Sequence, residues 1–161
     1  MIYICLILIV AMIIVATELI RRYSKKYRTM ISFRESFDLT GLPVITFTQG
    51  KNKLNFLFDT GATNSVIDSR LLEKLKYDKV EGATCDVYGM EGNVQSVNIV
   101  EIQLEKNMVY SDLFQVVDMS SAFDSVKAET GVLISGILGG TFFQKYKYVL
   151  DYSEMKVYSK A

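Results

Sequence analysis

The hydrophobic pattern divides the chain into two parts. Residues 2–20 are almost wholly aliphatic, with Thr17 and Glu18 only near the end of the run. From about residue 31 the pattern changes to short segments rich in Val, Ile, Phe and Tyr, which Gly, Asn and Asp separate. Long apolar runs are typical of membrane helices, and short apolar segments between turn residues are typical of β-sheet proteins. The sequence therefore predicts a mainly β domain that follows an N-terminal helix.

The first segment has the length of a membrane span. A helix from Ile2 to Ile20 would be about 28 Å long, enough to cross a bilayer. A secretory signal peptide needs a basic segment before the apolar run, and only the α-amino group precedes this one. A buried core helix would have a polar face, which is lacking here. We predict a transmembrane anchor at residues 1–22, a basic juxtamembrane linker at 23–32 and the folded domain at 33–161.

Basic residues cluster directly after this segment. They are Arg21, Arg22, Lys25, Lys26 and Arg28. An excess of Lys and Arg on one flank of a span marks its cytoplasmic side, so we expect a single-pass membrane protein with a cytoplasmic domain. The cluster can also bind anionic lipid head groups, but a flank without lipid specificity explains it more simply.

Alternation of apolar and polar residues predicts a hairpin at the start of the folded domain. Its strands lie at residues 44–49 and 53–58, around a Gly-Lys-Asn turn. The second strand ends directly before Asp59. A short strand at 65–67 follows, and Asp68 or Ser69 can then cap a brief helix.

The remaining pattern continues the β domain. We predict strands at residues 80–88, 94–104 and 108–117, a loop or short helix at 118–130, and a closing hairpin at 148–158. The turn at 89–92 holds two glycines, which makes it a candidate flap, although an ordinary hairpin loop explains the same residues. Residues 131–146 combine a buried apolar strand with glycines that allow close backbone approach, and Thr141 can cap a short helix there.

Composition excludes several kinds of chemistry. The chain contains no histidine, which removes Ser-His-Asp and Cys-His catalysis and the HExxH zinc site. Cys5 and Cys85 are isolated from one another and provide neither a disulfide framework nor a zinc spacing. The formal net charge is zero, so the chain lacks the basic surface that nucleic-acid binding requires. We predict no metal, no cofactor and no nucleic-acid partner.

The best candidate for chemistry is the Asp59-Thr60-Gly61 turn. Apolar residues on both sides of it, over residues 56–67, direct the turn toward the interior. An ionised carboxylate there is costly unless nearby donors stabilise it. Gly61 allows backbone N–H groups to approach the carboxylate, and the Thr60 hydroxyl can hold the loop by a hydrogen bond.

With these motifs the sequence resembles the retropepsin-like aspartic proteases over residues 44–158. Residues 58–62, Phe-Asp-Thr-Gly-Ala, are similar to the family's catalytic loop, and residues 136–139, Gly-Ile-Leu-Gly, to the element that supports that loop. The turn at 89–92 resembles the flap that closes over a bound peptide. The resemblance implies a closed β-barrel of the acid protease fold with one short C-terminal helix. Membrane-tethered bacterial members of the family exist.

The resemblance also implies roles for individual residues. Asp59 is the implied catalytic carboxylate, which Thr60 and Gly61 support. The implied substrate contacts are Ala62, Tyr88, Gly89, Met90, Gly92, Ile137, Leu138 and Gly139. The chain departs from the family at Thr141, where bacterial relatives often carry an acidic residue, and it lacks the Arg-Asn or Arg-Asp element of the viral enzymes. These departures bear on the dimer contacts more than on the active site.

Peptide hydrolysis of this type needs two carboxylates that share one proton. The chain holds a single Asp-Thr-Gly and no Asp-Ser-Gly, so the second carboxylate must be Asp59 of another copy. The leading hypothesis is thus a membrane-anchored, homodimeric aspartic endopeptidase that acts on peptide or protein substrates.

Two alternatives remain open at this point. A non-catalytic peptide-binding or dimerisation module of the same fold is favoured by the change at Thr141, and the intact Asp59 turn argues against it. An unrelated β-barrel with a coincidental Asp-Thr-Gly must also treat the Gly-Ile-Leu-Gly element at 136–139 as coincidence.

Overall fold

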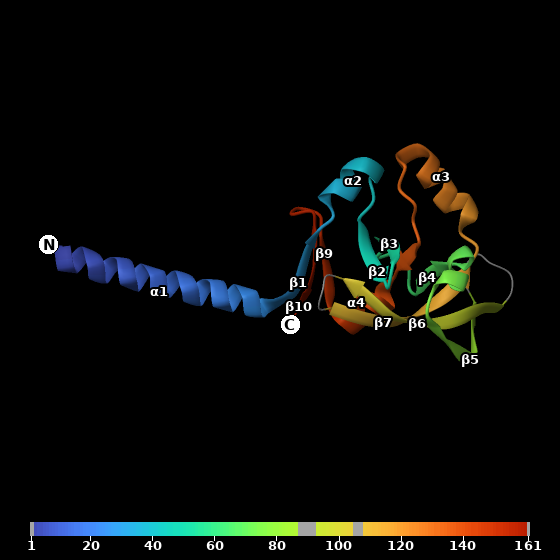
Figure 1. Ribbon diagram of the computed structural model, residues 1–161, viewed down its shortest axis with the longest axis horizontal. Coiled ribbons are helices and arrows are strands. Elements are labelled where there is room, and N and C mark those ends of the chain that lie inside the picture. The colour runs from blue at the N-terminus through green and yellow to red at the C-terminus, as the bar shows by residue number, and fades with distance from the viewer. Residues whose placement is uncertain (1, 87–92, 105–107, 161) are drawn as a thin grey trace.

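The computed structural model describes residues 2–86, 93–104 and 108–160. It begins with the helix α1 (Ile2–Lys26), which extends away from the folded domain (Figure 1). Apolar side chains of α1 between residues 8 and 20 are 49% to 68% exposed. In the part of the chain that the structure describes, no helix offers an apolar stretch long enough to cross a membrane, so the predicted transmembrane helix is not supported there.

Six strands close into a barrel, and a closed barrel is what the family resemblance implies. Around the barrel they run β2 (Val44–Gln49), β3 (Asn52–Phe58), β8 (Gly136–Leu138), β4 (Ser65–Asp68), β7 (Met108–Val117) and β6 (Asn93–Leu104). The barrel closes where Thr48 of β2 lies opposite Gln103 of β6. A further strand, β5 (Tyr77–Asp86), pairs with β6 outside this ring. The strands on both sides of the Asp-Thr-Gly turn, β3 and β4, thus lie on either side of β8.

A second, three-stranded sheet joins the two ends of the folded domain. Its antiparallel strands have the order β1 (Tyr27–Ser32), β10 (Lys156–Lys160) and β9 (Tyr148–Asp151). β9 and β10 form the predicted closing hairpin. β1 comes from the segment that the sequence suggests is a linker, and it pairs with β10 from Tyr27 opposite Lys160 to Ser32 opposite Lys156.

Helices cover the ends of the barrel. They are α2 (Arg34–Thr40), the 3-10 helix η1 (Ser69–Lys74), α3 (Ser120–Thr130) and α4 (Gly140–Tyr146). The Asp68 side chain caps η1 by accepting from the Arg70 N–H, as predicted. The predicted Thr141 cap is wrong, because α4 begins at Gly140 and the Thr141 N–H donates to the Thr63 carbonyl at 3.0 Å. α2 and α3 lie at the same end of the barrel (Figure 1).

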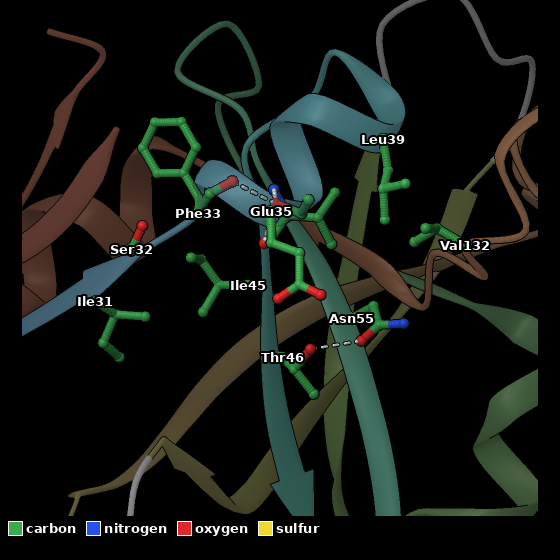
Figure 2. A pocket seen from close by; sticks show the side chains of 11 residues that line it. Ile31, Ser32, Phe33, Glu35, Leu39, Ile45, Thr46, Asn55 and Val132 are labelled. Atoms are coloured by element: carbon green, nitrogen blue, oxygen red, sulfur yellow. Dashed lines mark hydrogen bonds between the residues drawn. The ribbon is translucent and has the colours of Figure 1, made fainter. Parts of the chain in front are cut away.

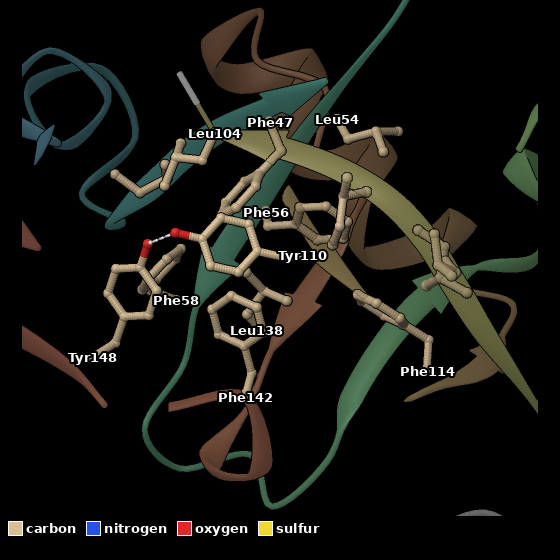
Figure 3. Close-up of a cluster of buried hydrophobic side chains, with 14 of the residues drawn as sticks. Phe47, Leu54, Phe56, Phe58, Leu104, Tyr110, Phe114, Leu138, Phe142 and Tyr148 are labelled. Atoms are coloured by element: carbon tan, nitrogen blue, oxygen red, sulfur yellow. Dashed lines mark hydrogen bonds between the residues drawn. The ribbon is translucent and has the colours of Figure 1, made fainter. Parts of the chain in front are cut away.

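Aromatic side chains fill the barrel. Phe56 and Phe58 alternate inward from β3 and are 0% and 2% exposed. Phe58 contacts Phe142 of α4, with ring centroids 6.2 Å apart. The hydroxyls of Tyr110 and Tyr148 lie 2.7 Å apart inside this cluster, so each buried hydroxyl has a partner (Figure 3). The core therefore holds the strand that leads into Asp59 directly against the C-terminal helix.

The opposite face of β3 packs against α3. Leu57 points away from the barrel interior and, with Ile137 of β8, packs on a small second core of Val44, Phe123 and Ile134. Phe123 is the buried residue of α3. A short helix, at residues that the sequence leaves as loop or helix, therefore packs against part of this face, and Leu57, Ile137 and Val66 on it stay partly exposed.

Candidate active site

Asp59 begins the loop between β3 and β4. Its N–H donates to the Leu138 carbonyl of β8 at 3.1 Å, and the preceding Phe58 N–H donates to the Pro43 carbonyl at 3.0 Å. The Ala62 N–H donates to the Asp59 carbonyl at 3.3 Å, and this hydrogen bond closes the turn. Backbone hydrogen bonds from two other segments therefore fix the position at which the carboxylate leaves the sheet.

The Asp59 carboxylate is half-buried and accepts a hydrogen bond from within its own loop. The Gly61 N–H donates to Asp59 Oδ1 at 2.8 Å, which confirms that the glycine brings a backbone donor to the carboxylate. A Cβ on Gly61 would lie 3.3 Å from the same oxygen, a tight contact. Thr60 is exposed, and the expected hydrogen bond of its hydroxyl is not seen among the described residues.

The Gly136 to Gly139 element lies directly against this loop. A Cβ on Gly139 would be 2.6 Å from the Asn64 carbonyl oxygen and 2.8 Å from that of Ala62. The next residue, Gly140, donates its N–H to the Ala62 carbonyl at 2.8 Å. The segment that the sequence predicts as a support for the loop is in contact with it, and only glycine fits at position 139.

Ile137, Leu138 and Gly139 take different positions around the loop. Leu138 is fully buried in the barrel, so its carbonyl rather than its side chain serves the loop. Gly139 is buried against the loop itself. Ile137 is partly buried and pairs with Leu57 on one side and Val66 on the other.

These pairings define the face of the sheet that carries the carboxylate. Residues paired across strands share a face, so Leu57, Ile137 and Val66 point the same way. Side chains alternate along a strand, and Asp59 therefore leaves the sheet on the Leu57 side, opposite the buried Phe58. An apolar wall thus adjoins the carboxylate, and the predicted contact Ala62 lies half-buried at the loop itself.

The predicted flap residues Tyr88, Gly89, Met90 and Gly92 lie outside the described residues. The strands that lead to them are present, since Asp86 of β5 pairs with Asn93 of β6. The hairpin is therefore confirmed, and the role of its turn stays a prediction.

Two hollows lie on this part of the molecule. One, of about 200 Å³, borders the loop from Thr60 to Thr63 and the start of α4, and its lining carries no charged side chain. The other, of about 420 Å³, lies beside α2, where Glu35 extends toward Thr46 and Asn55 (Figure 2). The catalytic loop contributes no residue to the larger hollow. The smaller hollow borders the residues that follow Asp59, and Asp59 itself does not line it.

The described residues offer few groups that could take part in catalysis. No group of three acidic or sulfur side chains that could hold a metal ion occurs within the described ranges. One carboxylate with a backbone donor can take a proton from water or give one to a carbonyl oxygen. Sequence reasoning did not single out Ser65 and Asp112, which lie behind the loop. The alternation of Tyr110, Asp112 and Phe114 was a signal, because it places a carboxylate at an inward position.

Similarity to known proteins is found among solved structures and in a family profile. No curated protein matches the chain. Among solved structures, the chain is similar to the EIAV protease complexed with the inhibitor HBY-793, with 25% identity and a TM-score of 0.43 over 65% of this chain and 86% of that one. It is also similar to a retropepsin-like aspartic protease from Rickettsia conorii, with 16% identity and a TM-score of 0.46 over 73% of this chain and 82% of that one.

The assignment rests on the family profile rather than on these structural likenesses. A profile described as aspartyl protease matches residues 45–142, which is more than half of the chain. The matched range contains the Asp59 loop, the supporting element at 136–139 and all six barrel strands except the first residue of β2. This chain belongs to the aspartyl protease family.

Proposed function

We propose that the chain is an aspartic endopeptidase whose active site contains Asp59 from each of two copies. The observation that carries the proposal is the Asp59 loop, which backbone hydrogen bonds to Leu138 and Gly140 hold in place. A lone turn carboxylate would not need this support. The two carboxylates would share one proton across a two-fold axis.

The reaction then follows from the positions of the protons. The ionised carboxylate takes a proton from a water molecule, whose oxygen bonds to the peptide carbonyl carbon. The protonated carboxylate gives its proton to the carbonyl oxygen, which leaves a neutral tetrahedral diol. When the C–N bond breaks, the first carboxylate passes its proton to the amine nitrogen and the second recovers one from a diol hydroxyl. Activity is expected to be greatest at the pH at which the pair holds a single proton.

The requirement for a second copy is supported by sequence and fold. The chain has one Asp-Thr-Gly, so a single copy supplies one catalytic carboxylate. Thr60 and Gly61 are exposed beside Asp59, where a second loop can approach. In the described terminal sheet, β1 and β9 are edge strands, which another copy can extend by backbone pairing.

The substrate in this proposal is an extended peptide. An extended chain pairs through its backbone and places alternate side chains against the enzyme surface. The wall of Leu57, Ile137 and Val66 is apolar, which favours apolar substrate side chains near the cut.

We include membrane anchoring through residues 2–20 in the proposal. Its support is the aliphatic sequence and the exposure of side chains such as Met12 and Ile20, both 68% exposed, which water alone would solvate poorly. The basic cluster at 21–28 supports a cytoplasmic domain. Two copies anchored in one membrane would meet at a raised effective concentration.

The catalytic proposal is tested with the full-length protein in lipid vesicles and a peptide library from acidic to neutral pH. We expect cleavage by the wild type and none by Asp59→Asn. Asp38→Asn, which changes an exposed carboxylate on α2, is the matched control and should cleave normally. Cleavage by Asp59→Asn would refute the aspartic mechanism, and no cleavage by a proven wild-type dimer would favour a binding module.

Mixing wild-type chains with Asp59→Asn chains tests whether two copies share one active site. With a large excess of Asp59→Asn chains, most wild-type chains should pair with a defective partner and lose activity. Activity proportional to the amount of wild type, whatever the excess, would show that one copy acts alone. Orientation is a separate question, answered by protease accessibility of the domain in intact cells. An outside domain contradicts the cytoplasmic assignment.

A further inference from the structure

A carboxylate points into the barrel directly behind the catalytic loop. On β7 the inward positions are Tyr110, Asp112 and Phe114, and Asp112 is only 4% exposed. Burying an ionisable group among aromatic residues is costly, so its contacts require an explanation.

Three donors surround the Asp112 carboxylate. The Ser65 hydroxyl donates to Oδ2 at 2.9 Å, the Leu113 backbone N–H contributes a further hydrogen bond, and Lys145 Nζ lies 3.6 Å from Oδ1. Lys145 is about half exposed, and a long ion pair at such a site contributes little to stability. The contact with Ser65 is short and fully buried, and it links Asp112 to the first residue of β4.

The same Ser65 oxygen holds the backbone of the loop support. A serine hydroxyl has one proton, and here it is given to Asp112. The oxygen lone pairs therefore face the Gly139 N–H, which donates to Ser65 Oγ at 3.3 Å. If Ser65 lost its acceptor, the hydroxyl could turn its proton toward that N–H and break the contact. The carboxylate thus sets the direction of a hydrogen bond that it does not itself make.

Gly139 passes this constraint to the loop that carries Asp59. Its backbone is packed against Ala62 and Asn64, and the next N–H, that of Gly140, donates to the Ala62 carbonyl at 2.8 Å. A continuous line of contacts therefore runs from Asp112 through Ser65 and Gly139 to the catalytic loop. A small displacement of a catalytic group is enough to lower a rate by large factors.

We propose that Asp112 is a positioning residue for catalysis, which orients the Ser65 hydroxyl so that Gly139 holds the Asp59 loop in its reactive position. This rests on the proposed role of Asp59. Burial raises the pKa of Asp112 even though Ser65 and Lys145 act to lower it. The fold thus keeps a carboxylate at a position where ionisation is unfavourable, which agrees with a role other than stability.

The test compares two buried serines that make the same kind of contact. Ser65 Oγ accepts from the Gly139 N–H, and Ser135 Oγ accepts from the Asn55 N–H at 3.0 Å, at the end of β8 away from the loop. Ser65→Ala and Ser135→Ala remove one hydroxyl each and should lower the unfolding temperature to a similar extent. Only Ser65→Ala should lower kcat, about tenfold, with little change in KM. Ser65→Thr, which keeps the hydroxyl, should recover most of the rate.

Asp112→Asn tests the carboxylate itself. An amide cannot accept at its nitrogen, so one of the three donors around position 112 loses its acceptor. We expect kcat to fall while the unfolding temperature near neutral pH is kept or raised, because a buried charge is removed. A residue that served only the fold would not separate activity from stability in this way.

Hydrogen exchange of the Gly139 amide, measured by NMR on the full-length protein, gives a readout independent of cleavage. Exchange should accelerate in Ser65→Ala and Asp112→Asn and stay at the wild-type rate in Ser135→Ala. If the wild type is active but Ser65→Ala and Asp112→Asn both keep its kcat, this proposal alone is overturned. Unchanged exchange of the Gly139 amide in these two variants would overturn it in the same way. An inactive wild-type dimer instead overturns the proposed function on which it depends.

Discussion

At the scale of single residues, the neighbouring glycines Gly139 and Gly140 differ in the space that a side chain would have. A Cβ at Gly139 would lie 2.6 Å from the Asn64 carbonyl oxygen, whereas a Cβ at Gly140 would stay 3.6 Å from its nearest atoms. We expect Gly139→Ala to destabilise the fold by about 2 kcal/mol or more, because backbone must move. Gly140→Ala, at the first position of α4, should stay within about 0.5 kcal/mol of the wild type. Urea unfolding measures both, and equal losses would contradict the close approach.

Asp112 predicts a pH dependence of stability. Burial raises the pKa of the Asp112 carboxyl in the folded protein above its ordinary value, so the folded protein holds this proton more tightly than the unfolded chain. The contribution of the Asp112 carboxyl to the free energy of unfolding is fully present below its pKa in the unfolded chain, and it is lost as pH rises through the raised pKa of the folded protein. Relative to the wild type, Asp112→Asn should therefore gain unfolding free energy as pH rises from about 4 to 7. Urea unfolding at several pH values measures the difference.

Asp118 is the control, because its carboxyl should change the free energy of unfolding with pH in the opposite direction. Hydrogen bonds from Ser120 lower the pKa of its carboxyl, so its contribution is present at neutral pH and lost as pH falls through the lowered value. Asp118→Asn should therefore lose stability relative to the wild type as pH rises over the acidic range. The same slope for Asp112→Asn and Asp118→Asn would contradict the assignment.

At the scale of elements, α3 is held to the barrel mainly by apolar contact. Phe123 is 4% exposed and packs in the second core, whereas the ion pair of Asp124 with Arg70 joins side chains that are 55% and 42% exposed. Phe123→Ala should cost about 3–5 kcal/mol of unfolding free energy. Asp124→Ala should cost under about 1 kcal/mol, because water and salt screen the pair. Thermal unfolding distinguishes the two, and similar losses would show that the ion pair holds α3.

At the scale of the whole molecule, the folded domain begins at β1. Ile31 of this strand packs against the core, and β1 covers the edge of β10. A chain that starts at Tyr27 should keep the unfolding temperature of the full-length domain. A chain that starts at Phe33 should unfold at lower temperature and tend to associate through the exposed edge. Circular dichroism and sedimentation compare the two, and equal behaviour would show that β1 is dispensable.

The sequence by itself determined the local elements and the candidate chemistry. The β3 hairpin, the strand of residues 108–117 and the Asp59 turn follow from alternation and from turn residues, which act within a few positions of the chain. The absence of histidine and the single Asp-Thr-Gly directed attention to one carboxylate. The resemblance of the motif at 136–139 to the family's supporting element predicts its role, and its glycines allow the close backbone approach that this role needs.

Only the tertiary structure decided which segments meet. β1 pairs with β10 from the other end of the chain, and no local pattern in residues 27–32 specifies that partner. Closure of the barrel through Thr48 and Gln103 likewise depends on strands far apart in sequence. The line from Asp112 through Ser65 to Gly139 exists because β7, β4 and β8 become neighbours. Local patterns fix the face and the turn, whereas the contacts between faces come from the packing of the whole chain.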